Sequence, residues 1–516
     1  MQRTTTSHGG TVAAGHTETA RAASEVLRAG GNAFDAAVTA MFCACVAEPI
    51  LASLGGGGFM TARPWDDAPL VYDFFTQTPI HKQPSEAIDF SPILADFGTA
   101  RQTFHIGLGA IATPGMVRGI FQIHRELCTM PLPSLIQPAI RLANQGVRVN
   151  PFQHLIAEIV SPILFASEQA LALHASPVDP HRLIQEGELH RQPELADFLD
   201  CLGREGEGLF YAGEAGQHLI ADCRRQGGQL RQADLDDYRV IRRQPLSQAY
   251  RNARLLTNPL PSLGGTLVTF GLSLLESQPL PEMPLGGERH LRTLCRAMCL
   301  TQQLRNQQSG DLGRLLDPQL RQAYCRILAE GGVCRRGTTQ ISIADRQGNL
   351  ASVTLSNGEG AGYVIPGTGI MPNNMLGEED LNPRGFQRWP ENRRLASMMA
   401  PSLLLFDDGR VVVTGSGGSN RIRSVILQVI SNLVDFGLPL QQAIEQPRLH
   451  FEGDLLSLEP LHSPRVASLL EDEFPHQQRW ERPSLFFGGA HTVMIDSDQG
   501  LQGAGDPRRG GVARVC

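Results

Sequence analysis

The sequence predicts an α+β fold in which two β-sheets lie between layers of helices. Apolar residues recur at helical spacing through the first third of the chain, and an alternating strand pattern begins at Thr338. Hairpin signals and a further amphipathic helix follow. Because every sheet and helix must bury an apolar face, this order of elements predicts two packed sheets with helices outside them.

The first third of the chain is expected to be mainly helical. Residues 17–29 carry Ala and Leu at helical spacing and stop at a Gly-Gly pair, and Asn32 can cap a second helix over 33–47. A glycine cluster at 55–58 comes before a strand candidate that ends at 70–75. Further helices are expected at 115–127, 132–145 and 216–226.

Strands are expected mainly after Thr338, in three hairpins. The first hairpin turns at 345–349, the second joins 403–406 to 411–414, and the last joins 492–495 to 501–503. A glycine loop at 416–419 leads from the second hairpin into an amphipathic helix that ends at Gly437.

Composition indicates a globular chain that acts on a small molecule. Of 516 residues, 41% are hydrophobic and 19% are charged, as in an ordinary folded enzyme. Lys and Arg number 45 against 52 Asp and Glu, so the formal net charge is -7, and it is spread without blocks. This pattern argues against nucleic acid or an anionic membrane as a partner. We therefore expect a small-molecule substrate, no nucleic acid and no membrane.

The sequence carries no signal for targeting or for a cofactor. The chain does not open with a charged segment followed by an apolar one, and its longest apolar run, around 36–47, is too short to span a bilayer. We therefore expect a cytoplasmic protein. The ten Cys residues lack the paired spacing of a zinc site, and no G-x-S-x-G, H-E-x-x-H or phosphate-loop motif occurs. We expect neither a metal nor an organic cofactor.

The pair Thr338-Thr339, directly after Gly337, could supply a nucleophile. Cleavage of the bond between Gly337 and Thr338 would leave Thr338 with its hydroxyl and a free α-amine. An unperturbed α-amine has a pKa of about 7.7 to 8.0 and can act as a general base near neutral pH. The alternative is that two β-prone threonines simply begin a strand.

Short motifs follow one another in a specific order along nearly the whole chain. They are Gly30-Gly31-Asn32-Ala33-Phe34-Asp35-Ala36-Ala37, Leu54-Gly55-Gly56-Gly57-Gly58-Phe59, Thr113-Pro114-Gly115, Ala139-Ile140-Arg141-Leu142-Ala143, Asp236-Asp237-Tyr238, Thr338-Thr339, Gly348-Asn349, Gly369-Ile370, Asn373-Asn374, Thr414-Gly415-Ser416-Gly417-Gly418-Ser419 and Asp506-Pro507-Arg508. Together they resemble the γ-glutamyltranspeptidases. The resemblance implies an N-terminal nucleophile hydrolase with a four-layer αββα sandwich. It also implies an inactive precursor that cleaves itself into a large-subunit region, 1–337, and a small-subunit region, 338–516, which stay associated as one domain.

By this resemblance Thr338 is the nucleophile, first in self-cleavage and then on a glutamyl substrate. The backbone at Gly417 and Gly418 would stabilise the oxyanion. The strand next to Thr338 would supply a hydroxyl and an amide that steady the nucleophile and the substrate; the candidates are Ser356 and Asn357, with Thr354 as an alternative hydroxyl.

The resemblance also suggests how the substrate would be held. Glu378 would bind the substrate α-amine, with Glu379 and Asp380 as competitors for this role. Ser397, with Ala396 beside it, would face the α-carboxylate.

The chain departs from the family pattern at several positions. Phe75 stands where the family has an Arg that pairs with the α-carboxylate in a bidentate way. Gln340 stands where a His usually follows the Thr pair, Met375 replaces a polar residue, and the segment 382–393 is short for the family's lid loop. Self-cleavage is therefore expected to be intact, and glutamyl recognition is expected to be altered.

Three functions are consistent with the sequence. The first is a self-processing, γ-glutamyltranspeptidase-like enzyme that hydrolyses or transfers a γ-glutamyl group through an acyl-Thr338 intermediate. The second, suggested by Phe75, is an N-acyl amidohydrolase that resembles the glutaryl cephalosporin acylases. The third is a non-catalytic homologue that acts as a binding protein.

Overall fold

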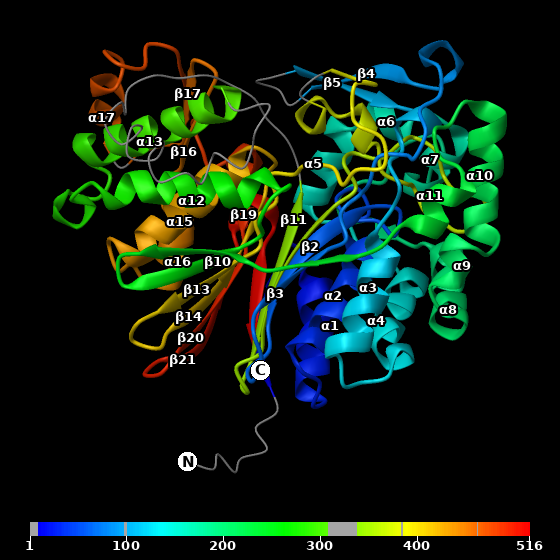
Figure 1. Cartoon of the computed structure of the whole chain (residues 1–516), viewed down its shortest axis with the longest axis horizontal. Helices are drawn as coiled ribbons and strands as arrows, with labels where there is room; N and C mark the ends of the chain where they lie inside the picture. The colour runs from blue at the N-terminus through cyan, green and yellow to red at the C-terminus, as the bar shows by residue number, and fades with distance from the viewer. Residues whose placement is uncertain (1–8, 97–100, 308–337, 383–384, 462) are drawn as a thin grey trace.

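Two antiparallel sheets form the centre of the molecule (Figure 1). The computed structural model describes residues 9–96, 101–307, 338–382, 385–461 and 463–516. The larger sheet has seven strands, which lie in the order β22 (Val512–Val515), β1 (Gly10–Ala14), β11 (Thr339–Asp345), β12 (Leu350–Ser356), β2 (Gly57–Arg63), β3 (Leu70–Asp73) and β8 (Ile241–Arg243).

The second sheet has six strands and packs against the first. Its order is β21 (Gly500–Ala504), β20 (Thr492–Asp496), β14 (Val411–Thr414), β13 (Ser402–Phe406), β10 (Ala253–Thr257) and β9 (Leu246–Tyr250). Strands β1, β11 and β12 lie against β20, β21, β13 and β14. Apolar side chains fill part of this interface: Ala13, Ala344, Leu350, Leu403, Val413 and Val493.

Helices cover the outer face of the first sheet (Figure 1). They are α1 (Thr17–Arg28), α2 (Ala33–Ala47), α3 (Met116–Leu127) and α4 (Leu132–Gln145). Every residue of α2 is buried, because α2 packs against α1, α3, α4 and the strands β11 and β12. Its start is fixed by a capping box in which Asn32 and Asp35 satisfy each other's backbone N–H groups.

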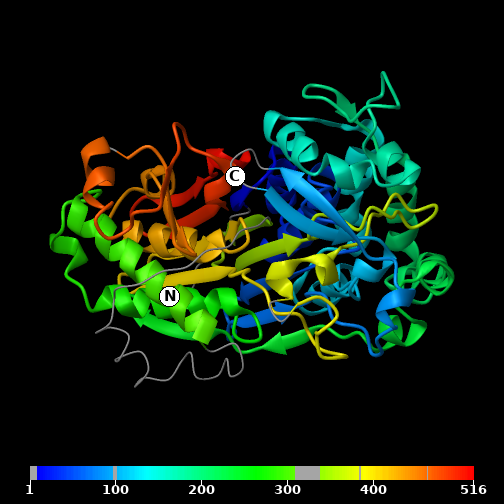
Figure 2. The ribbon, with the colours of Figure 1, turned by 90° about the horizontal axis from the view of Figure 1, so that it is seen from above.

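A second group of helices covers the outer face of the six-stranded sheet. It contains α12 (Leu263–Glu276), α13 (Glu288–Gln307), α15 (Arg421–Val434) and α16 (Leu440–Glu445). Side chains such as Phe270 and Ile426 pack with Leu404 and Val412 of the sheet in one apolar cluster. Seen from above, the blue and cyan helices lie on one side of the strands, and the orange helices lie on the other (Figure 2). The predicted class of mixed helix and sheet is therefore confirmed.

Smaller elements surround these layers. They are β4 (Ser91–Asp96), β5 (Arg101–Ile106), β6 (Val147–Arg148), α5 (Pro151–Ile159), α6 (Ser161–Leu164), α7 (Glu168–His174), β7 (Leu189–His190), α8 (Pro193–Glu205), α9 (Gly208–Tyr211), α10 (Glu214–Gln226), α11 (Gln232–Asp237), β15 (Ser416–Gly417), β16 (Leu449–Glu452), β17 (Leu455–Leu458), α17 (Pro464–Leu469), β18 (Gln477–Arg479) and β19 (Gly489–Ala490). None of the helices in the described ranges is both long and apolar enough to cross a membrane.

Most predicted elements occur within a few residues of their expected bounds, but several strands were missed, among them β1, β9 and β10. No element was predicted before the helix over 17–29, whereas residues 10–14 form β1, between β22 and β11. All five residues of β1 are buried, so it shows no alternation of polar and apolar residues. A fully buried strand of this length cannot be recognised by periodicity.

Candidate active site

A pocket opens where strand β11 begins, and Thr338 lines it. Thr338 directly precedes β11 and is 4% exposed, whereas Gly337 lies outside the described residues. The lining residues are Phe75, Leu263, Thr338, Ser356, Glu378, Asp380, Leu381, Ala396, Ser397, Met398, Met399, Ser419 and Ile422. Thus Thr338, Ser356, Glu378, Ala396 and Ser397, all of them predicted site residues, meet around one pocket although they are far apart in sequence.

The backbone of the glycine loop approaches Thr338 closely. A Cβ atom at position 417 would overlap the carbonyl oxygen of Thr338, so only glycine fits there. Gly418 has φ +125°, a left-handed conformation that a residue with a Cβ adopts only under strain. Gly417 itself is held by strand pairing with Gly489. The sequence therefore uses glycine here to bring main-chain atoms next to the nucleophile candidate.

Strand register decides between the two candidate hydroxyls. Thr339 pairs with Leu355, and the next step of this antiparallel register places Ser356 opposite Thr338. Thr354 lies opposite Gln340 and donates its hydroxyl to Gln340 Oε1 at 2.6 Å. Ser356 is therefore the hydroxyl beside Thr338, and Thr354 belongs to a separate hydrogen-bond network.

Asn357 is not among the residues that line the pocket. It is 1% exposed, and its Nδ2 donates to the Met371 carbonyl oxygen at 3.2 Å. Its amide therefore ties the end of β12 to the loop that contains Met371. Gly417 and Gly418 are also absent from the lining; Gly417 lies against the Thr338 carbonyl oxygen, and Gly418 directly precedes Ser419, which lines the pocket.

Two of the three acidic candidates reach the pocket. Glu378, which follows the short helix η5 (Met375–Gly377), lines it and is 7% exposed. Asp380 also lines it and accepts a hydrogen bond from Ser419 Oγ at 3.1 Å. Glu379 does not line it. The carboxylates make this side of the pocket negative.

Ser397 also lines the pocket and lies beside the start of α12. Its Oγ accepts a hydrogen bond from the Met399 N–H at 3.1 Å, and its carbonyl oxygen accepts one from the Leu263 N–H at 2.7 Å. These bonds fix the 396–399 segment against the helix. The Ser397 side chain therefore lines the pocket from a well-held backbone.

Phe75 gives the pocket an apolar wall. Its ring is 1% exposed and stacks on Phe59, with ring centroids 5.5 Å apart. The nearby Arg394 forms an ion pair with Asp73 at 3.4 Å and binds the Phe75 carbonyl oxygen. Among the described residues, no Lys, Arg or His lines the pocket. Among the described lining residues, therefore, no cation replaces the arginine that the family pattern has at the position of Phe75.

Comparison with known proteins identifies the family. The family model described as gamma-glutamyltranspeptidase matches residues 19–516. The chain is 30% identical to the Acylase ACY 1 proenzyme of Pseudomonas sp. (strain SE83), over 96% of this chain and 91% of that protein. It is 28% identical to the glutathione hydrolase proenzyme of Escherichia coli (strain K12), over 94% and 88%.

The chain belongs to the gamma-glutamyltranspeptidase family. The resemblance seen in the sequence is therefore correct, and so is the prediction of an enzyme of the γ-glutamyltransferase and glutathione hydrolase type. A crystal structure of cephalosporin acylase from Bacillus halodurans has the same fold, with a TM-score of 0.85 and 23% identity, and the match covers 98% of this chain and 96% of that one.

In this gamma-glutamyltranspeptidase family member, the Thr338-Thr339 pair is contacted by two residues that were not predicted from the sequence. Arg509 donates from Nη1 to the Thr338 carbonyl oxygen at 3.0 Å. Glu48 Oε2 accepts a hydrogen bond from Thr339 Oγ1 at 2.7 Å, and burial raises the pKa of this carboxyl to about 7. Arg509 directly follows the Asp506-Pro507-Arg508 motif, which was its only sequence signal. Glu48 follows the expected helix over 33–47 and had none.

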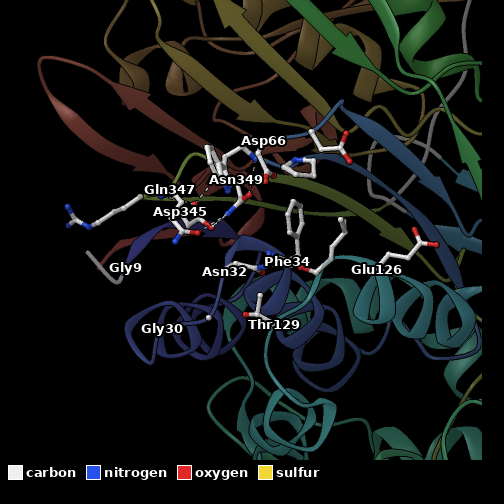
Figure 3. A pocket seen from close by; sticks show the side chains of 16 residues that line it. Gly9, Gly30, Asn32, Phe34, Asp66, Glu126, Thr129, Asp345, Gln347 and Asn349 are labelled. Carbon is white, nitrogen blue, oxygen red and sulfur yellow. Dashed lines mark hydrogen bonds between the residues drawn. The ribbon is translucent and has the colours of Figure 1, made fainter. Parts of the chain in front are cut away.

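A larger pocket lies at the other end of β11 (Figure 3). Its residues include Asp345, whose Oδ2 accepts hydrogen bonds from the Ala33 N–H at 2.9 Å and from Asn349 Nδ2 at 2.7 Å. Asp345 thus ties the first hairpin to the start of α2. It lies seven residue steps along the strand from Thr338, about 23 Å at 3.3 Å per residue. This pocket is therefore remote from the candidate nucleophile.

Proposed function

We propose that the chain cleaves itself between Gly337 and Thr338 and then acts as a γ-glutamyltranspeptidase-like amide hydrolase and acyltransferase through an acyl-Thr338 intermediate. The observation that carries the proposal is the position of Thr338, at a strand start, in a pocket and against the Gly417 backbone. Family membership supports it, and the curated relatives are named as proenzymes.

Self-cleavage would proceed by an N-to-O acyl shift. Thr338 Oγ attacks the Gly337 carbonyl carbon, the bond from that carbon to the Thr338 nitrogen breaks, and the nitrogen takes up the hydroxyl proton. Water then hydrolyses the resulting ester, which frees the Gly337 carboxylate and regenerates the Thr338 hydroxyl. The product is a chain that begins with Thr338 and carries its own base.

Catalysis would use the same atoms. The Thr338 α-amine takes the Oγ proton as Oγ attacks the substrate's amide carbon, and the amine product leaves with that proton. Water or a second amine then takes the acyl group from Thr338. Backbone N–H groups of Gly417 and Gly418 would stabilise the oxyanion in each step, by about 2.7–4 kcal/mol for a well-placed donor. The scheme uses neither a metal nor an organic cofactor.

The other predicted residues would hold the substrate. Ser356, opposite Thr338, would orient the nucleophile, and Asn357 would support this strand end through its bond to Met371. Glu378 would bind a substrate amine, and the wall formed by Ala396 and Ser397 would face the rest of the acyl head group.

We also propose that a large-subunit region, 1–337, and a small-subunit region, 338–516, remain together as one αββα sandwich. Both sheets mix strands of the two regions. In the seven-stranded sheet, β1 lies between β22 and β11, and β12 pairs with β2. In the six-stranded sheet, β10 pairs with β13. Cleavage before β11 would therefore leave the sheet hydrogen bonds between the two pieces intact.

A denaturing gel tests the proposal. The purified wild type should give two bands, with the smaller beginning at Thr338 by mass spectrometry. Thr338→Ala should remain one band and lack amidase activity, whereas Thr338→Ser, which keeps a hydroxyl, should mature and retain some activity. A wild type that is fully active as an unbroken chain would refute the proposal.

Phe75 favours a second candidate, an N-acyl amidohydrolase for acyl groups without an α-amino acid head. Its apolar ring stands in the pocket wall where the family pattern has an arginine. The similarity to an acylase proenzyme supports the same candidate. The two are separated by comparing hydrolysis of a γ-glutamyl anilide with that of a glutaryl anilide by the processed enzyme. A clear preference for glutaryl would favour the second candidate.

A further inference from the structure

The Arg509 side chain reaches the candidate nucleophile through space that neighbouring glycines leave open. It ends the short helix η8 (Pro507–Arg509), and it is 4% exposed. Its Nη1 donates to the Thr338 carbonyl oxygen at 3.0 Å, and its Nε donates to the Leu485 carbonyl oxygen at 3.3 Å. A Cβ atom at Gly489 would lie 2.8 Å from the Arg509 stem, and one at Gly417 would lie 3.2 Å from Nη1. The glycines thus leave space for a buried guanidinium beside Thr338.

We infer that Arg509 is a positioning residue that holds the Thr338 backbone and, through its positive charge, keeps the α-amine released by self-cleavage in its unprotonated, basic form. The inference rests on the proposed role of Thr338 as an N-terminal nucleophile. A protonated amine cannot accept the hydroxyl proton, so a nearby fixed cation favours the active form.

Geometry places the cation within range of the amine. Three covalent bonds, about 4.2 Å in total length, join a residue's nitrogen to its own carbonyl oxygen. The guanidinium nitrogen at 3.0 Å from that oxygen is therefore within about 7 Å of the Thr338 nitrogen. At about 6 Å and an effective dielectric constant of about 20, the repulsion corresponds to about two pKa units.

Other charges around Thr338 reduce this effect. Asp506 is already paired with Arg448 at 2.5 Å, and burial lowers the pKa of His491 to about 4, so His491 is neutral at pH 7. Four carboxyl groups lie near the amine or the guanidinium on other elements: Glu359, Glu378, Asp380 and Glu48. They offset part of the lowering, but they act on wild type and Arg509 variants alike, so the shift caused by removal of the Arg509 charge stays at about two pKa units.

Processed Arg509→Gln enzyme provides the test. We compare kcat/KM for a γ-glutamyl or glutaryl anilide, whichever the wild type cleaves, between pH 5 and 10. In Arg509→Gln the pKa of the acidic limb should rise by about two units, so kcat/KM should fall at least about tenfold at pH 7 and should recover most of this loss by pH 10. Arg509→Lys should keep the wild-type profile. Arg410→Gln, which removes a guanidinium from the β13–β14 hairpin, is the matched control and should change nothing.

Several results would overturn the inference. They are an unchanged acidic limb in Arg509→Gln, a loss of activity that is equal at all pH values, and a rise of KM alone, which would indicate a substrate contact. Arg509→Met is a second neutral variant with a similar stem. If both neutral variants stay unprocessed while Arg509→Lys matures, the charge acts on peptide cleavage and not on the released amine. Failure of the wild type to mature would instead refute the proposed function.

Discussion

Replacement of Glu48 by Gln should stabilise the protein at alkaline pH. Glu48 is 4% exposed at the end of α2, and Oε2 accepts the Thr339 hydroxyl at 2.7 Å. Burial raises the pKa of this carboxyl from 4.5 to about 7, since the charged form loses its hydration. Gln has nearly the same shape, carries no charge and still offers an oxygen to Thr339. The substitution therefore removes a buried charge and keeps the hydrogen bond.

The magnitude follows from the two pKa values. Between pH 4.5 and 7 the folded state holds the Glu48 proton and the unfolded state does not, so the free energy of unfolding falls as the pH rises through this window. The difference of about 2.5 pKa units corresponds to about 3.4 kcal/mol above pH 7, and to less than about 1 kcal/mol at pH 5. The free energy of unfolding of Glu48→Gln should exceed that of the parent by these amounts.

Denaturant unfolding at pH 5 and pH 8 measures the effect, in a Thr338→Ala background that keeps one chain. The measured quantity is the difference in free energy of unfolding between variant and parent, because buried histidines change the stability of both proteins with pH in the opposite direction. Burial lowers the pKa of His290, His450 and His491 to about 4, so they cost stability as the pH falls from 6.5. Exposed Glu481→Gln is the control. A Glu48→Gln effect that is equal at both pH values would refute the reasoning.

Two further substitutions test the packing around Thr338. Gly417→Ala should block maturation or lower activity at least about 100-fold, because its Cβ would displace the Thr338 carbonyl. A denaturing gel and an amidase assay measure these effects. Gly208→Ala, which places a Cβ in open space, is the control and should behave as wild type. Gln340→Leu should lower the free energy of unfolding by about 1–3 kcal/mol, because the buried Thr354 hydroxyl loses its acceptor. Adding Thr354→Val should restore part of that loss, and no restoration would argue against this hydrogen bond as the cause.

Periodicity predicted the elements that have one exposed or one clearly apolar face. The helices at 17–29 and 33–47 and the hairpin around 345–349 were placed almost correctly, because capping and turn residues mark their ends. Strand β1 was missed because five buried small and β-branched residues carry no such marks. Its place between β11 and β22 depends on pairing with residues more than three hundred positions away.

Residues of the pocket were predictable only where the family resemblance assigns them. Thr338 belongs to a quoted motif, Ser356, Glu378 and Ser397 were assigned by their places in the family pattern, and the fold brings all four to one pocket. Arg509 was missed because its contact with the Thr338 carbonyl oxygen joins residues that are far apart in the sequence. No local pattern of residues specifies such a contact.

The place of Thr338 in the sheet explains how a new chain end could stay ordered. Chain termini usually fray, since few hydrogen bonds hold them. Here residues 339–344 of β11 pair with β12 and residues 341–345 pair with β1, and Gly417 and Arg509 meet the Thr338 carbonyl. A terminus created at Thr338 would therefore be anchored from its first carbonyl onward. Self-cleavage before a central strand would thus leave the new amine and its hydroxyl fixed at the pocket, whereas the same cut in a surface loop would leave both free to move.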